Sequence, residues 1–101
     1  MRKLNITPYK TEKGIDYPIK DAFSSLLFHP NLGLTMKDVI PQGELDKKIH
    51  DAEEYVLLEE EEYRRVLRAF ESFKGFSKDD IELVKRVQNA SPIEISQIKE
   101  I

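Results

Sequence analysis

The chain has 101 residues, of which 40% are hydrophobic and 35% charged, and its formal net charge is -3. This length suits one domain better than two, and the hydrophobic content excludes a wholly disordered chain. The absence of cysteine excludes disulfides, thiolate nucleophiles and cysteine zinc sites. Because the start of the chain lacks a signal-like apolar stretch and no segment approaches about 18 consecutive apolar residues, we expect a soluble cytoplasmic protein without membrane association.

Charge is distributed unevenly along the chain. Residues 1–50 carry 8 basic and 6 acidic groups, whereas residues 51–101 carry 8 basic and 13 acidic groups. Proteins that bind nucleic acids neutralise phosphates with clustered Lys and Arg. An acidic second half therefore makes nucleic acid an unfavoured partner.

The first predicted elements are two short strands and a helix. Residues 3–6 and 15–19 read as extended segments joined in a hairpin by loop-tolerant residues. Pro18 lacks a backbone donor, so the second strand is expected at a sheet edge. A helix is then predicted over residues 22–28, with Asp21 as its cap and a His-Pro-Asn sequence after it.

The middle of the chain predicts two short helices and a strand. Thr35 and Asp38 form a capping-box variant, which indicates a brief helical turn before Pro41. A narrow apolar stripe predicts a second helix over residues 44–54. The run Tyr-Val-Leu-Leu at 55–58 favours a short strand, although periodicity alone also allows the start of the next helix.

The longest predicted helix covers residues 59–73. It combines a broad apolar face with pairs in which a glutamate precedes an arginine by four residues. Gly75 is predicted as its left-handed C-cap, and Ser77 caps a further helix that runs to about residue 90. Alternation at 93–95 predicts a last short strand. The whole chain is therefore expected to form a single α+β domain, residues 1–101, with an N-terminal hairpin and short strands in a small antiparallel sheet packed against three to four helices.

Charged side chains on the 59–73 helix are the first candidate binding residues. Arg64, Arg65 and Arg68 can present guanidinium groups to phosphates or carboxylates. Glu60 and Glu61 begin an acidic surface, but they also lie at salt-bridge spacing from the arginines. These three arginines and two glutamates form a charged ridge, which is either a ligand- or partner-binding surface or an internally paired, solvated helix face.

Aromatic residues and strand edges are the second candidates. Tyr9 and Tyr17 flank the predicted hairpin turn and can serve as aromatic anchors for a partner, or alternatively cover the core from outside. The short strands leave sheet edges that can pair with another chain. Self-association through such an edge, or through the apolar face of the long helix, predicts a homo-oligomer.

No catalytic residue, metal or cofactor is expected. The four glutamates at 59–62 point about 100° apart around a helix and cannot converge on one ion. His29 and His50 lie in different predicted elements, and no serine has the context of a nucleophile elbow. No Gly-rich phosphate loop is present.

Two stretches carry a resemblance to a known class of proteins. Residues 17–22 (Tyr-Pro-Ile-Lys-Asp-Ala) and 48–58 (Lys-Ile-His-Asp-Ala-Glu-Glu-Tyr-Val-Leu-Leu), followed by a helix that begins in glutamates, resemble small accessory proteins of tailed bacteriophages and prophages. The resemblance implies a viral accessory protein and no reaction.

The leading hypothesis is thus a non-enzymatic interaction protein of phage or mobile-element origin. It would bind a host or viral protein through an acidic helical surface or a sheet edge, and countering a host defence is one role that this hypothesis includes. The alternative is an oligomeric protein that sequesters a nucleotide or small phosphorylated ligand at a subunit interface, using the three arginines together with Lys85 and Arg86. A DNA-binding regulator that reads with the helix starting at residue 78 is a third hypothesis, opposed by the acids on that helix.

Overall fold

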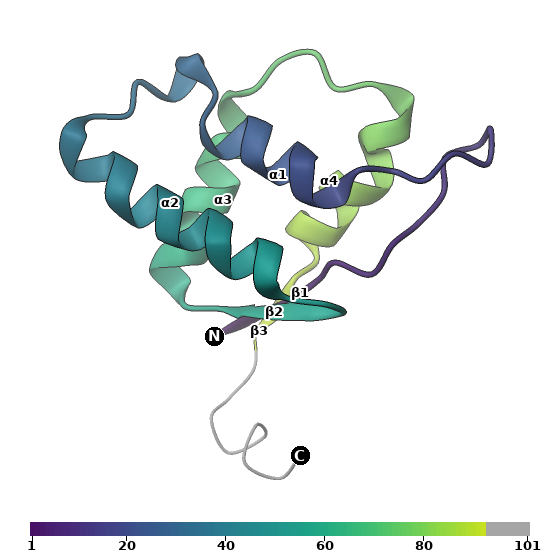
Figure 1. Ribbon diagram of the computed structural model, residues 1–101, viewed down its shortest axis with the longest axis horizontal. Coiled ribbons are helices and arrows are strands. Elements are labelled where there is room, and N and C mark those ends of the chain that lie inside the picture. The colour runs from purple at the N-terminus through teal and green to yellow at the C-terminus, as the bar shows by residue number, and fades with distance from the viewer. Residues whose placement is uncertain (93–101) are drawn as a thin grey trace, which may run out of the picture.

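In the computed structural model, which describes residues 1–92, helices lie above a small sheet at one end of a flattened molecule (Figure 1). The principal extents are 39 × 38 × 21 Å. This arrangement confirms the predicted α+β class. The elements in chain order are β1 (Arg2–Asn5), α1 (Ile19–Leu27), the 3-10 turn η1 (Pro30–Leu32), α2 (Met36–Asp51), β2 (Tyr55–Leu58), α3 (Glu60–Ser72), the 3-10 turn η2 (Lys78–Asp80), α4 (Ile81–Gln88) and β3 (Ser91–Pro92).

The predicted N-terminal hairpin is wrong. β1 lies at the centre of the sheet, in the order β2-β1-β3, and pairs antiparallel with both neighbours. Residues 15–19 form no strand, and only one isolated bridge joins Lys10 to Asp16. Ile19 instead begins α1, because together with Phe23, Leu26 and Leu27 it completes an apolar helix face that is buried in the core.

The start of α1 also differs from the prediction. Pro18 occupies the N-cap position, and Asp21 lies within the first turn rather than capping the helix. A carboxylate in this turn is favoured by the positive end of the helix dipole, so Asp21 supports the helix without capping it.

Helix α2 runs unbroken through Pro41, where two separate helices were predicted. Proline removes one backbone hydrogen bond and usually ends a helix. Here the helix is held on both sides of the proline. The Thr35–Asp38 capping box forms as predicted, and Gln42, Leu45 and Ile49 are buried further along.

The second half of the chain follows its local signals closely. Strand β2 covers the predicted residues. Helix α3 begins at a capping box, in which the side chains of Glu59 and Glu62 each accept a hydrogen bond from the other residue's backbone N–H. Ser77 caps the next element, which is a 3-10 turn followed by α4 rather than one helix to residue 90. The predicted strand at 93–95 lies outside the described residues.

Gly75 has φ +117°, in the region that favours glycine. It lies in the loop after α3 and not at the helix end, because α3 stops at Ser72 and Phe73 is already extended. Within residues 1–92, no helix is long and apolar enough to cross a membrane.

Candidate interaction sites

Some side chains of the charged ridge of α3 contact neighbouring elements, and the others are exposed to solvent. Arg65 reaches across to α2, where its Nη1 donates to Oε1 of Gln42 at 3.3 Å. Arg64 lies 3.6 Å from Glu61, and both side chains are largely exposed. Glu60 pairs with Arg2 of β1 at 3.0 Å. Two members of the predicted site, Glu60 and Arg65, therefore connect α3 to neighbouring elements.

Arg64 and Arg68 remain together on the outer face of α3. With Leu67, Glu71 and Ser72 they surround a shallow hollow of about 400 Å³. Glu71 and the neighbouring Glu61 oppose the positive charge of these arginines, so the hollow is only weakly selective for anions.

The two candidate tyrosines pack on each other. The rings of Tyr9 and Tyr17 stack with centroids 4.8 Å apart. The Tyr9 hydroxyl donates to the Asp79 carbonyl at 3.2 Å, and the Tyr17 hydroxyl donates to Oδ1 of Asp80. The pair thus ties the chain before α1 to the start of α4, and covers the core from outside.

Burial raises the pKa of the Tyr17 hydroxyl, and the hydrogen bond to the Asp80 carboxylate raises it further. A group whose pKa is raised by folding contributes stability below its unfolded pKa, about 10, and loses that contribution as the pH rises above this value. We therefore expect the protein to lose stability above pH 10, and Tyr17→Phe to lose less over the same range. At neutral pH this substitution should cost about 1 kcal/mol, the net value of one hydrogen bond.

Urea unfolding of both proteins at pH 8 and at pH 11 measures the difference. Tyr55→Phe is the matched control, because Tyr55 is exposed and makes no side-chain hydrogen bond with residues 1–92. An identical alkaline loss in the wild type and in Tyr17→Phe would contradict the assignment.

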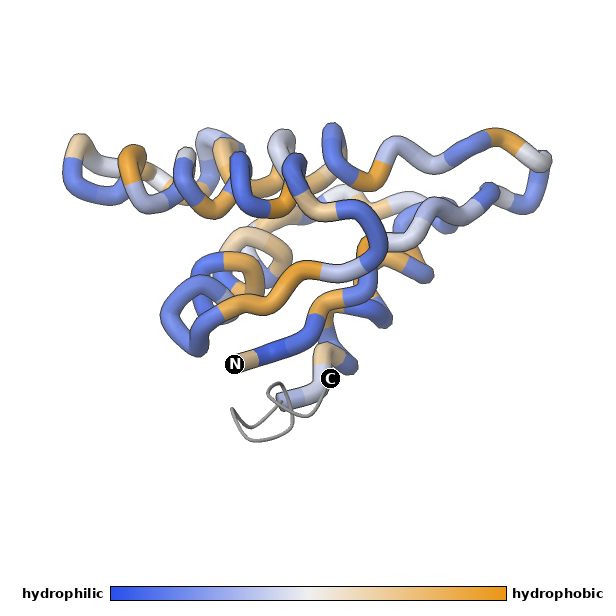
Figure 2. Tube along the Cα trace, turned by 60° about the horizontal axis from the view of Figure 1, so that its bottom comes forward, coloured by the Kyte–Doolittle hydropathy of each residue, from blue (hydrophilic) through white to orange (hydrophobic). Residues whose placement is uncertain are grey.

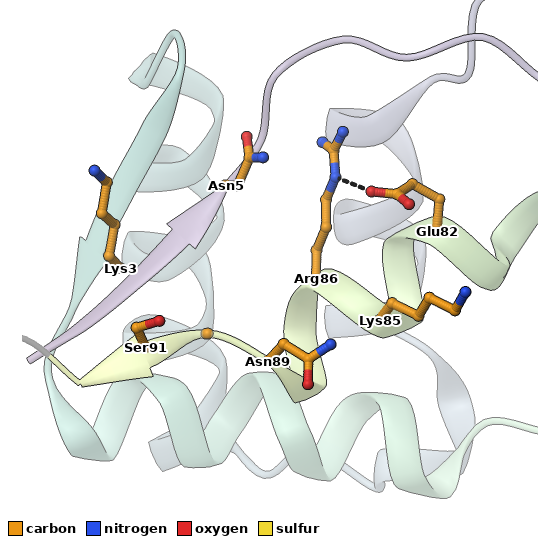
Figure 3. A pocket seen from close by; sticks show the side chains of 8 residues that line it. Lys3, Asn5, Glu82, Lys85, Arg86, Asn89 and Ser91 are labelled. Carbon is orange, nitrogen blue, oxygen red and sulfur yellow. Dashed lines mark hydrogen bonds and ion pairs between the residues drawn. The ribbon is translucent and has the colours of Figure 1, made fainter.

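A hollow of about 440 Å³ lies between the sheet and the end of α4 (Figure 3). Its cations do not converge. In Figure 3 the ammonium groups of Lys3 and Lys85 lie at opposite ends of the hollow. Arg86 is engaged internally, because it pairs with Glu82 at 2.8 Å and donates to the Thr7 carbonyl at 2.6 Å. The arrangement therefore suits neither a phosphate clamp nor a helix that reads DNA.

The outer edge of β2 is an unpaired strand edge. Ile6 donates its backbone N–H to the Glu54 carbonyl at 2.9 Å. Because hydrogen-bonded pairs alternate along an antiparallel ladder, this contact directs the backbone of Val56 and Leu58 towards β1. The N–H and C=O groups of Tyr55 and Leu57 consequently face the opposite side, where no strand of the described chain pairs with them.

Acidic residues frame this edge. Figure 2 shows β2 as a hydrophobic stretch with hydrophilic chain before and after it. Glu53 and Glu54 precede the strand, Glu59 and Glu60 follow it, and all four are exposed. Within residues 1–92, only Glu60 of these four takes part in an ion pair.

No group of three or more His, Asp or Glu residues within positions 1–92 is arranged to hold a metal ion. Comparisons with protein-family models, with curated proteins and with solved structures find no match for this chain. The resemblance to phage accessory proteins is therefore still a prediction.

Proposed function

We propose that this chain is a non-enzymatic protein-interaction module that binds an extended segment of a partner along the free edge of β2. The observation that carries the proposal is the pair of outward-facing backbone units at Tyr55 and Leu57, framed at both ends by exposed glutamates. Main-chain hydrogen bonds to an added strand supply affinity, and flanking side chains supply selectivity.

The acidic frame determines which strand fits. Glutamates stand at both ends of β2, so a segment with Lys or Arg on each side of a short β-forming core finds opposite charges in either orientation. Such a partner, a host or viral protein in the phage setting that the sequence suggests, would bind less well at high salt because the carboxylates are exposed.

The same frame opposes pairing of this edge with itself. In a symmetric antiparallel pair centred on Val56, Glu53 of one copy stands opposite Glu59 of the other. Like charges placed directly opposite each other destabilise a strand pair. The expected homo-oligomer would therefore have to use another surface, and the exposed Met36, Val39 and Ile40 of α2 form one group of apolar residues that such a surface could include.

Leu57→Pro tests the proposal with little damage to the fold. The N–H of Leu57 points away from β1, so proline removes a donor from the free edge and leaves the β1–β2 ladder intact. We expect this variant to bind a fluorescent peptide, with a Val-Thr-Val-Thr core between lysine pairs, at least about tenfold more weakly than the wild type, or 1.4 kcal/mol. Fluorescence anisotropy measures the affinity.

Leu57→Thr, which keeps the N–H, is the matched control and should bind like the wild type. The same peptide with glutamates in place of lysines should not bind. Equal binding by Leu57→Pro and the wild type would exclude the β2 edge, and equal binding of both peptides would exclude the acidic frame.

One observation favours a second candidate, the sequestration of a phosphorylated ligand. Arg64 and Arg68 border the same 400 Å³ hollow, which is large enough for a small phosphorylated molecule. A rise in melting temperature with a nucleotide or sugar phosphate, lost in Arg68→Ala, would support this candidate over the strand edge.

A further inference from the structure

A small hollow of about 170 Å³ lies between α1 and the loop that joins α3 to η2, and no residue of β2 lines it. Aromatic rings form much of its wall. It is lined by Tyr17, His29, Phe73, Phe76 and Asp80, together with small or aliphatic residues of α1. This volume is well below the 300–1,000 Å³ of typical sites for drug-sized ligands, so it suits a group of only a few heavy atoms.

The rings stand at steep angles to one another. Phe73 meets His29 at 85° with centroids 5.1 Å apart, and meets Phe76 at 68° with centroids 4.9 Å apart. Phe70 stacks on Phe76 at 5.8 Å and supports it from the core. Tyr17 is supported in the same way by Tyr9. The pocket therefore has the shape of a corner with aromatic walls rather than a flat apolar patch.

Gly75 makes this corner possible. Its positive φ turns the chain between Phe73 and Phe76, so that both rings line the same hollow. A side chain at position 75 would be strained by this φ, although its Cβ would meet the Phe73 ring only at an ordinary contact distance of 3.9 Å. Gly75 therefore sets the turn of the loop that places the Phe73 and Phe76 rings beside the same hollow.

One acidic group lies among these rings. Oδ2 of Asp80 accepts the Ser77 N–H at 2.7 Å and the Ser77 hydroxyl at 3.1 Å, and Oδ1 accepts the Tyr17 hydroxyl. No Lys or Arg within residues 1–92 pairs with this carboxylate. The donors that fix the carboxylate are all neutral, so no formal positive charge is paired with it, although the N-terminus of α4 directly after it stabilises its negative charge.

We propose that this pocket binds a methylated ammonium group. The faces of aromatic rings carry negative potential and attract cations, and quaternary ammonium groups are recognised by aromatic cages of this kind. Methyl groups spread the charge and pack against the rings, while Asp80 adds a formal negative charge. An anion would be repelled, and a neutral group of the same shape would leave the carboxylate unneutralised. The inference is independent of the strand edge at β2.

Choline and its neutral isostere 3,3-dimethylbutan-1-ol test this proposal directly. Titration followed by NMR should show choline shifting the signals of Phe73 and Phe76. The isostere should bind about tenfold more weakly, or 1.4 kcal/mol, because it has no charge to interact with the ring faces and the Asp80 carboxylate. Equal affinity for the two compounds would overturn the proposal, because the pocket would then recognise shape alone.

Trimethyllysine and lysine amides identify the source of the cation. Tighter binding of trimethyllysine amide than of choline supports a modified protein side chain as the ligand, whereas tighter binding of choline supports a free small molecule. Equal binding of lysine and trimethyllysine amides would contradict the requirement for methyl groups.

Phe76→Leu should weaken choline binding about fivefold or more, because an aliphatic side chain remains apolar but has no ring face. Phe28→Leu is the matched control, since Phe28 and Phe76 are exposed to nearly the same extent, 40% and 37%. Asp80→Asn removes the charge and should weaken choline binding while sparing the isostere. Circular dichroism verifies folding, and unchanged choline binding in folded Phe76→Leu would exclude this site.

Discussion

Replacing Phe23 with alanine should lower the free energy of unfolding by about 3–5 kcal/mol. The Phe23 side chain is fully buried, and its ring lies 5.7 Å from that of Phe70. It therefore joins α1 to α3 at the centre of the core. Small domains are stable by only about 5–15 kcal/mol, so the variant would approach its unfolding midpoint at room temperature.

Urea denaturation followed by circular dichroism measures this loss, with Phe28→Ala as the control. Phe28 follows α1 directly, but 40% of its surface is exposed, so its truncation should cost about 1 kcal/mol or less. If both variants lost the same stability, α1 would not pack against α3 as described.

The sequence predicted those elements whose signals are local. The Thr35–Asp38 capping box and the cap at Ser77 were both predicted, and each marks the start of an element in the structure. The structure adds a capping box at Glu59, where α3 was predicted from its apolar face and acidic start. Strand β2 was also predicted correctly over residues 55–58, although periodicity alone equally allowed these residues to begin the following helix.

The wrong predictions of secondary structure arose where contacts with residues distant in the sequence determine the structure. Residues 15–19 have strand-like composition, but β1 pairs with β2 and β3, which supply the buried partners that a local hairpin could not. Proline is a strong local signal for a helix end, yet α2 continues past Pro41 because its later residues are buried against the rest of the core. Tertiary packing overrode propensity in both places.

The candidate sites were predictable to different degrees. An exposed strand edge and the aromatic candidates Tyr9 and Tyr17 were both evident in the sequence. Which edge stays free depends on the pairing of β1, and the aromatic pocket depends on loops that bring Tyr17 and His29 near Phe73. The sequence also could not show that Arg65 is bound within the structure while Arg64 is exposed. This difference depends on Gln42 of α2, which accepts a hydrogen bond from Arg65.

Gln42 carries the second large expected effect. It is the buried polar side chain in the described core, with 2% of its surface exposed. Its Nε2 donates to the Leu27 carbonyl at the end of α1 at 2.9 Å, and its Oε1 accepts from Arg65 of α3. One amide thus links three helices, and it satisfies a carbonyl that the end of α1 would otherwise leave unpaired.

We expect Gln42→Ala to cost about 3 kcal/mol, because it creates a cavity and leaves the Leu27 carbonyl without its partner. Gln42→Met, which keeps the volume but not the hydrogen bonds, should cost about 1–2 kcal/mol and thereby separate packing from polar satisfaction. Gln88→Ala, at an exposed position of α4, is the control and should change stability by less than about 0.5 kcal/mol. Chemical denaturation measures all three variants. A methionine at position 42 that matched or exceeded wild-type stability would mean that the amide contributes selectivity of packing rather than net free energy, since apolar replacement of a buried polar group can be neutral when its partners find water.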